Sequence, residues 1–182
     1  APTNCVGSNV DRDVTVHPLP TPTLASDDAD DIICDGDVVV FTGGGGTNYE
    51  FYVNGSLAQA NSADATYDTD TLVDGDVVTV LVTDGNSCQA LSGGINMTVN
   101  PIPVVDPTPT AQSICSGENA NISLASIPAG GTFAWKYYET ALLGGSDGTG
   151  NTIFEQLDNL GASYEAATYR IATTLNGCVS DS

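Results

Sequence analysis

The five cysteines are the side chains whose spacing most clearly predicts chemistry. They form two classes, because the motif Ile33 to Asp37 resembles Ile114 to Glu118, and Asn86-Ser87-Cys88 resembles Asn176-Gly177-Cys178. None lies in a Cys-x-x-Cys arrangement, the spacing that zinc and redox sites use. We therefore predict structural disulfides, and pair Cys34 with Cys88 and Cys115 with Cys178. The alternative is a set of buried free thiols in a reducing compartment.

The cysteines also set the register of an internal repeat. Aligning Cys5 with Cys88 places Pro18-Leu19-Pro20 on Pro101-Ile102-Pro103 without a gap. Residues 1–18 are then the final strand of an upstream module, 19–102 a complete module, and 103–182 a module that lacks its last strand. The partner of Cys5 is expected in the upstream module, outside the chain.

Apolar residues alternate with a period of two rather than 3.6, which is typical of strands. Strand-like runs end at Asn54-Gly55 and Asp84-Gly85, residues that accept the positive φ of hairpin turns. Only residues 151–160 could form a short helix. About seven short strands per repeat predict an all-β chain of tandem immunoglobulin-like β-sandwiches with one disulfide per module. Phe51 and Trp135 fall at equivalent strand positions and are expected to pack in the cores, against the disulfides.

The charge excludes whole classes of partner. The chain carries 23 acidic residues against 3 basic ones, a net charge of −20. Such a surface repels nucleic acids and anionic lipid headgroups. The apolar runs are far shorter than the roughly 20 residues that span a bilayer, so we expect no direct membrane insertion. The expected partners are neighbouring modules of the same chain and other copies in a filament.

A run of carboxylates follows the first Pro-x-Pro linker, and it includes Asp28, Asp30 and Asp31. Crowded carboxylates suit calcium, which binds six to eight oxygens. The spacing is not that of an EF-hand loop, so these residues are weak calcium candidates. A solvated, solubilising loop is the alternative. No other cofactor is expected.

Catalysis has few candidate residues. The lone His17 lies beside Pro18, and no Gly-x-Ser-x-Gly motif or Cys-His pairing accompanies it. Composition leaves a glycosidase-type carboxylate pair open, although acids on turns are more often solvated charges. We therefore predict that the protein is not an enzyme.

Tyrosines alternate around the predicted central strands, so some must face outwards. Tyr52 and Tyr138 are the candidates for a binding face. Such tyrosines more often cover a sheet without binding a ligand.

Four segments of the complete module carry a family resemblance: Ile33 to Thr42, Tyr49 to Gly55, Thr71 to Val80 and Val82 to Cys88. Together they resemble the tandem Ig-like or PKD-like modules of giant Bacteroidetes cell-surface adhesins of the SprB-like gliding and adhesion type. The resemblance implies secretion through a type IX pathway and display on the cell surface, as part of a stalk or filament. Asp70-Thr71-Leu72 also resembles that phylum's O-glycosylation acceptor, which makes Thr71 a candidate site.

The predicted function is a structural repeat segment of an extracellular surface fibre or stalk used in adhesion or gliding. The alternative is a ligand-binding module that recognises a glycan or surface partner, with calcium assisting. An alternative assembly is strand donation between copies in a filament, because the module at 103–182 lacks its final strand.

Overall fold

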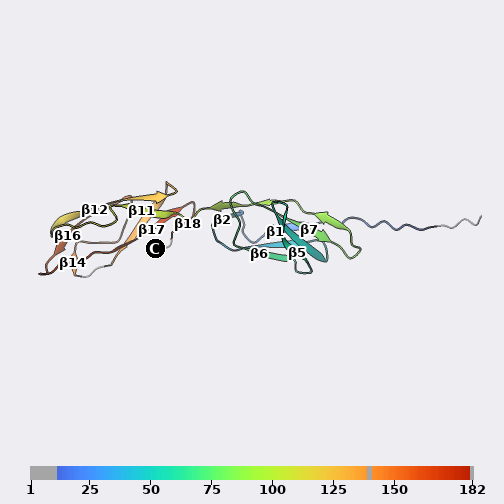
Figure 1. The fold of residues 1–182 in the computed structure, drawn as a ribbon, viewed down its shortest axis with the longest axis horizontal. Coiled ribbons are helices and arrows are strands. Elements are labelled where there is room, and N and C mark those ends of the chain that lie inside the picture. Colours follow the sequence, from blue (N-terminus) through green and yellow to red (C-terminus); the bar gives the residue numbers. More distant parts are fainter. Residues whose placement is uncertain (1–11, 139–140, 181–182) are drawn as a thin grey trace, which may run out of the picture. The chain divides into compact units, whose positions relative to one another are not determined.

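The structure is a computed structural model that describes residues 12–138 and 141–180 (Figure 1). Every regular element in these ranges is a β-strand, from β1 to β18, which confirms the all-β prediction. Within the same ranges no helix is long and apolar enough to cross a membrane.

The chain divides into two compact units that interleave along the sequence. Unit 1 comprises Ala1–Asp27, Val40–Asp68 and Val77–Ile95, and unit 2 comprises Asp28–Val39, Thr69–Asp76 and Asn96–Ser182. The sequence modules 1–18, 19–102 and 103–182 remain predictions.

Unit 1 is built from two sheets. The first has the order β1-β3-β6, formed by Thr23–Ser26, Val39–Gly44 and Thr66–Thr69. The second has the order β5-β4-β7-β8, formed by Ser56–Ser62, Asn48–Val53, Val77–Thr83 and Gln89–Leu91, and the short β9 (Ile95–Asn96) also pairs with β7. The β4–β5 hairpin turns at Asn54 and Gly55, whose φ angles of 51° and 75° are those the sequence motif predicted.

Aromatic side chains connect the two sheets of unit 1. The ring of Tyr67, on β6, lies 6.3 Å from that of Phe41 on β3 and 5.6 Å from that of Phe51 on β4. Phe41 and Phe51 are completely buried. The alternation of buried and partly buried residues along β7 places Val78, Val80 and Val82 in this core.

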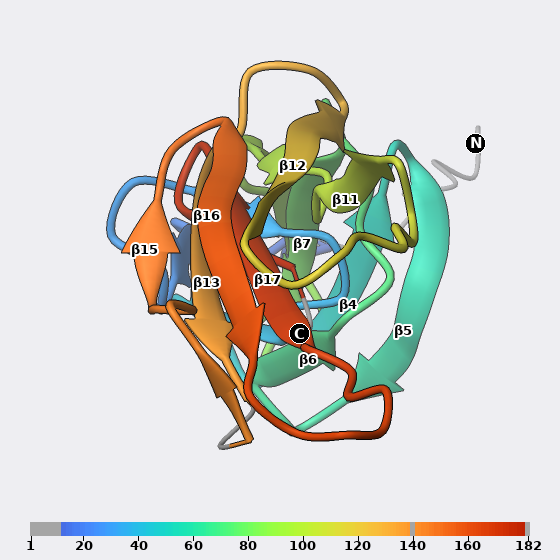
Figure 2. The same ribbon diagram turned by 90° about the vertical axis from the view of Figure 1, so that its left-hand side faces the viewer.

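Unit 2 contains two four-stranded antiparallel sheets and one parallel pair. The first sheet has the order β11-β12-β16-β14, formed by Val104–Thr108, Glu118–Ile127, Thr152–Asn159 and Leu142–Leu143. The second has the order β15-β13-β17-β18, formed by Gly148–Thr149, Thr132–Tyr137, Tyr169–Leu175 and Cys178–Val179. In Figure 2, β12 lies beside β16 and β13 lies beside β17. Two antiparallel sheets, one with β11, β12 and β16 and the other with β13 and β17, are the arrangement of an immunoglobulin-like sandwich.

The segment 151–160, considered above as a possible short helix, is the strand β16. Its backbone pairs with β12 from Glu118↔Leu157 to Ser123↔Thr152. Ile153 and Leu157 are buried, whereas the intervening Phe154 is 63% exposed. Pairing with a long neighbouring strand satisfies the backbone of this segment and sets its period to two.

The core of unit 2 is a cluster of Leu124, Phe133, Trp135 and Ile153. Trp135 is buried as predicted, and it lies over Gly148, where an added Cβ would meet the indole ring at 2.5 Å. The expected packing of Phe51 and Trp135 against Cys34–Cys88 and Cys115–Cys178 disulfides is wrong, because Cys34 pairs with Cys178 and the other two cysteines are free.

Candidate functional site around the Cys34–Cys178 disulfide

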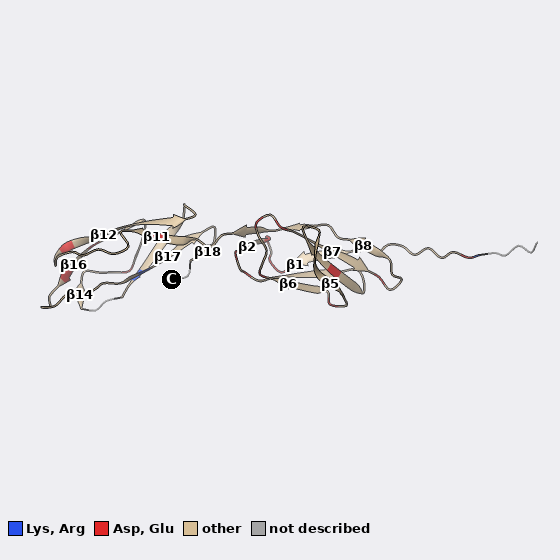
Figure 3. Cartoon of the chain, viewed as in Figure 1, with Lys and Arg blue, Asp and Glu red and all other residues tan. Residues whose placement is uncertain are grey.

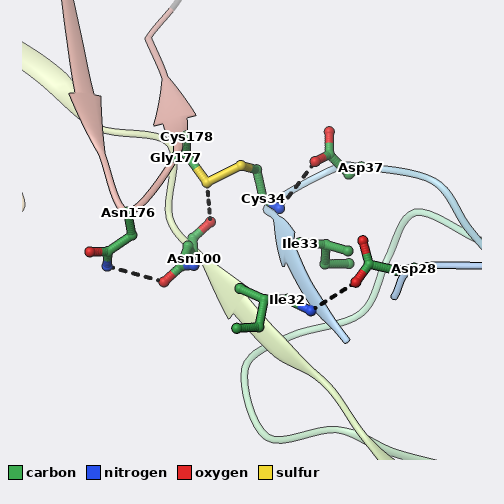
Figure 4. Close-up of a pocket in the computed structure, with 9 residues that line it drawn as sticks. All are labelled: Asp28, Ile32, Ile33, Cys34, Asp37, Asn100, Asn176, Gly177 and Cys178. Carbon is green, nitrogen blue, oxygen red and sulfur yellow. Dashed lines mark hydrogen bonds between the residues drawn. A yellow bond between two sulfur atoms is a disulfide. The ribbon is translucent and has the colours of Figure 1, made fainter. Parts of the chain in front are cut away.

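The most distinctive site lies in unit 2, at the parallel pair of β2 (Ile32–Cys34) and β10 (Thr98–Asn100). Their register places Asn100 beside Cys34 at the ends of the two strands. Cys178, the first residue of β18, forms a disulfide with Cys34, with a Cα–Cα distance of 5.7 Å (Figure 4). The bond closes a sequence separation of 144 residues.

The predicted pairings of Cys34 with Cys88 and of Cys115 with Cys178 are therefore wrong. The β2–β10 pairing brings the Asn100 carbonyl oxygen to 3.8 Å from the Cys178 sulfur, so Cys34 meets the closing cysteine of the following sequence repeat. Cys88 is free and half-buried, and Cys115 is free and exposed. Cys5 lies outside the described residues. The expectation of one disulfide within each module is corrected accordingly.

Asn100 and Asn176 hold the two halves of the site together. The Asn176 amide nitrogen donates to the Asn100 side-chain oxygen at 3.2 Å, and the Asp35 N–H donates to the Asn100 carbonyl at 2.9 Å. Asn176 and Gly177 have φ angles of 50° and 87°, which form the tight turn between β17 and β18. This turn aims Cys178 at β2.

An open cavity of about 180 Å³ adjoins the disulfide. Its carboxylates are engaged by the backbone: Asp37 accepts the Cys34 N–H at 3.1 Å, and Asp28 accepts the Ile32 N–H at 3.1 Å (Figure 4). Both bonds fix the ends of β2. The volume is below the roughly 300–1,000 Å³ of typical ligand pockets, so the disulfide and the hydrogen bonds around it are best interpreted as structural.

The calcium candidates Asp28, Asp30 and Asp31 surround the start of β2. Asp28 accepts backbone N–H groups of Asp30 and Ile32, and Asp31 has a φ of 57°, so the run forms a compact turn. Among residues 12–138 and 141–180, no group of three or more His, Cys, Asp or Glu side chains is arranged to hold a metal. Calcium binding itself stays a prediction.

The Asp28 turn predicts a pH dependence. Burial raises the pKa of Asp28, but hydrogen bonds from the Ile32 backbone and from Asp30 outweigh this effect and lower the pKa below 3.8. A lowered carboxyl pKa gives stability that is present above the unfolded-state pKa and is lost as the pH falls through the folded-state pKa. We expect the Ile32 amide chemical shift to titrate with a midpoint below 3.8, measured by NMR, and Asp28→Asn to abolish that titration. A midpoint above 3.8 would contradict the assignment.

The two tyrosine candidates lie in different units, Tyr52 in unit 1 and Tyr138 in unit 2. The Tyr52 hydroxyl donates to a Glu50 carboxylate oxygen at 2.6 Å, and this bond raises the pKa of Tyr52 above 10. Tyr138 is 49% exposed and its ring lies 4.8 Å from the Arg170 guanidinium carbon. Their role in binding stays a prediction.

Thr71 is exposed, directly after a turn, and its hydroxyl oxygen lies 3.1 Å from that of Thr69. The position is accessible to modification. O-glycosylation of Thr71 stays a prediction.

The turn that carries the free Cys88 is stabilised by the side chain of Asp84. The Asp84 carboxylate accepts the backbone N–H groups of Asn86 and Cys88, both at 2.8 Å. Desolvation raises the pKa of Asp84, but these hydrogen bonds and the charge of His17 lower it by more, so the net shift is downward.

Sequence reasoning missed Asn100 and a polar cluster around Glu155. Glu155 accepts the hydroxyls of Tyr169 at 2.7 Å and Ser146 at 2.6 Å, and thereby joins β16 to β17. Burial, and then the bond to Glu155, raise the pKa of Tyr169. Asn100 could have been recognised from the sequence repeat, because it precedes Pro101 as His17 precedes Pro18. Glu155 had none.

No family model matches the chain, and no curated protein matches it. Several solved structures are similar to it, and three of them are the following. The fibronectin(III)-like modules of Clostridium thermocellum CbhA have 14% identity and a TM-score of 0.42, over 88% of this chain and 90% of theirs. Murine CEACAM1b has 10% identity and a TM-score of 0.40, over 88% and 95%. A solved structure from work on a 1.5-MDa bacterial ice-binding adhesin has 13% identity and a TM-score of 0.37, over 91% of this chain and 63% of the chain in that structure.

Proposed function

We propose that the chain is a structural, non-catalytic repeat segment of an extracellular surface fibre or stalk used in adhesion or gliding. The observation that supports this most directly is the Cys34–Cys178 disulfide, which joins the opening cysteine of one sequence repeat to the closing cysteine of the next. In a series of repeats, such a bond links each repeat to the next through a disulfide as well as through the backbone.

The chemistry of the chain supports an extracellular location. Disulfides persist in oxidising environments outside the cytosol. Acidic residues occur in both units and basic residues are few, as Figure 3 shows. A net charge of −20 keeps neighbouring fibres apart and soluble.

The linkers fit a fibre as well. Proline fixes its own φ and restricts the residue before it, so Pro18 and Pro20, like Pro101 and Pro103, limit rotation where one repeat leads to the next. Pro103 is also completely buried, which holds that linker against the fold.

Electron microscopy of the native protein on cells, or sheared from them, tests the proposal. We expect thin beaded filaments whose repeat matches the length of one or two modules. Compact particles would overturn the fibre function. Reducing the sample before imaging provides a comparison, since filaments of covalently continuous modules should persist while their beads become less regular.

A further inference from the structure

We propose that Cys34 is a modification site for small thiols that carry an ammonium group, which attack the Cys34–Cys178 disulfide and form a mixed disulfide with Cys34. The site is independent of the proposed fibre function, because it is defined by the disulfide and the cavity beside it. Three properties of the cavity support it: which sulfur atom can be reached, which charges line the walls, and what surrounds the sulfur that is released.

The two sulfur atoms differ in their access to solvent. The open cavity of about 180 Å³ is lined by both cysteines, and all of its lining residues belong to unit 2. Cys34 is half-buried, whereas Cys178 is only 1% exposed. Because exchange requires a thiolate to approach a disulfide sulfur directly, the attack falls on Cys34. A cavity of this size admits a small thiol.

The charged residues that line the cavity are negative. Asp28 and Asp37 lie in its walls, and no lysine or arginine is among the described residues that line it. Figure 4 shows both aspartates on the Cys34 side of the disulfide, with Asn100 and Asn176 on the other side. The Asp37 carboxylate lies against the backbone of the reactive residue, because its Oδ2 atom accepts the Cys34 N–H at 3.1 Å.

These charges select among small thiols. A thiol with a carboxylate group is repelled by the two aspartates and by the net charge of −20, whereas a thiol with an ammonium group is attracted. An ionised carboxylate has about four acceptor positions, and the Cys34 N–H uses one of those on Asp37. Asp37 can therefore accept a hydrogen bond from the ammonium group while the thiol sulfur approaches Cys34.

The reaction exchanges one disulfide for another. The thiolate attacks the Cys34 sulfur, a sulfur–sulfur bond forms there, and the bond between Cys34 and Cys178 breaks. Cys178 leaves as a thiolate and takes up one proton, so one thiol is consumed, one is released, and no further oxidant is needed. The Asn100 carbonyl oxygen, 3.8 Å from the Cys178 sulfur, can accept a hydrogen bond from the new thiol.

Mass spectrometry after brief treatment with cysteamine tests the modification. The protein is the full chain with Cys5→Ser, Cys88→Ser and Cys115→Ser, so that Cys34 and Cys178 are its only cysteines. Iodoacetamide blocks free thiols when the reaction is stopped. We expect cysteamine on Cys34 and the carbamidomethyl group on Cys178. The opposite distribution, or a disulfide that does not react in the folded protein, would overturn the proposal.

The charge preference requires a second measurement. The rate constants for cysteamine and for mercaptoacetate are each divided by the thiolate concentration, and their ratio measures the selectivity. Asp28→Asn with Asp37→Asn should lower this ratio at least about threefold, a decrease in keeping with the modest strength of exposed ion pairs. Asparagine keeps an oxygen that accepts the backbone N–H groups, so the ends of β2 remain fixed.

A matched control removes two charges elsewhere. Asp106→Asn with Glu165→Gln changes two exposed residues outside the cavity, so the ratio should equal that of the parent. Sodium chloride at about 1 M, where the Debye length is about 3 Å, should lower the ratio of the parent without any substitution. Equal ratios for the parent and the cavity variant, equal decreases in both double variants, or a ratio insensitive to salt would each contradict the selection of ammonium thiols.

Discussion

Replacing Cys34 and Cys178 together by serine is expected to lower the free energy of unfolding of unit 2 by up to about 5 kcal/mol. The disulfide closes a separation of 144 residues, and a crosslink over so long a loop removes much of the entropy of the unfolded chain. Urea denaturation, followed by the fluorescence of the single tryptophan, Trp135, measures the loss because Trp135 lies in the core of unit 2.

The matched control is Cys88→Ser with Cys115→Ser, which removes the same number of sulfur atoms from the two free positions. Its stability should remain within about 0.5 kcal/mol of the parent chain, because neither residue is crosslinked or fully buried. Equal destabilisation by the two double variants would contradict the assigned pairing. Reduction of the parent should reproduce the effect of the first double variant and leave that variant unchanged.

Ile153→Ala is expected to cost roughly 2–5 kcal/mol of the free energy of unfolding. Ile153 is completely buried and packs in the cluster with Leu124, Phe133 and Trp135. Truncation removes apolar burial and leaves a cavity that the surrounding strands fill only partly. Thermal unfolding monitored by circular dichroism gives an independent measure of the loss.

The neighbouring residue provides the control. Phe154 lies on the same strand but is 63% exposed, so Phe154→Ala should change stability by about 0.5 kcal/mol or less. Similar losses for both variants would therefore contradict the strand and its register.

Strand positions were predictable because local signals carry them. β4 and β7 follow from alternating apolar residues, and Asn54-Gly55 marks the hairpin through its positive φ angles. β16 was ambiguous because its glycine-flanked segment has few β-branched residues, and only pairing with β12 determines its period. A local sequence pattern does not indicate which distant strand a segment pairs with.

The disulfide partner could not be predicted for a related reason. The sequence separates opening from closing cysteines, but loop-closure entropy changes slowly with loop length, so pairing Cys34 with Cys88 or with Cys178 is about equally acceptable in the unfolded chain. The choice is made by the parallel β2–β10 register and by the Asn176-Gly177 turn, which set where the sulfur atoms lie. The hydrogen bond of Asp28 could not be predicted either, because its carboxylate accepts the backbone N–H of Ile32 at the start of β2.

The Cys34–Cys178 bond also determines how the chain responds to force. Tension applied along the chain passes through the sulfur–sulfur bond, so the segment between the two cysteines carries little of it. A separation of 144 residues corresponds to roughly 500 Å of extended chain that cannot be pulled out while the bond is intact. A thread of such modules would lengthen very little before it broke, and the redox state of its surroundings would set its extensibility.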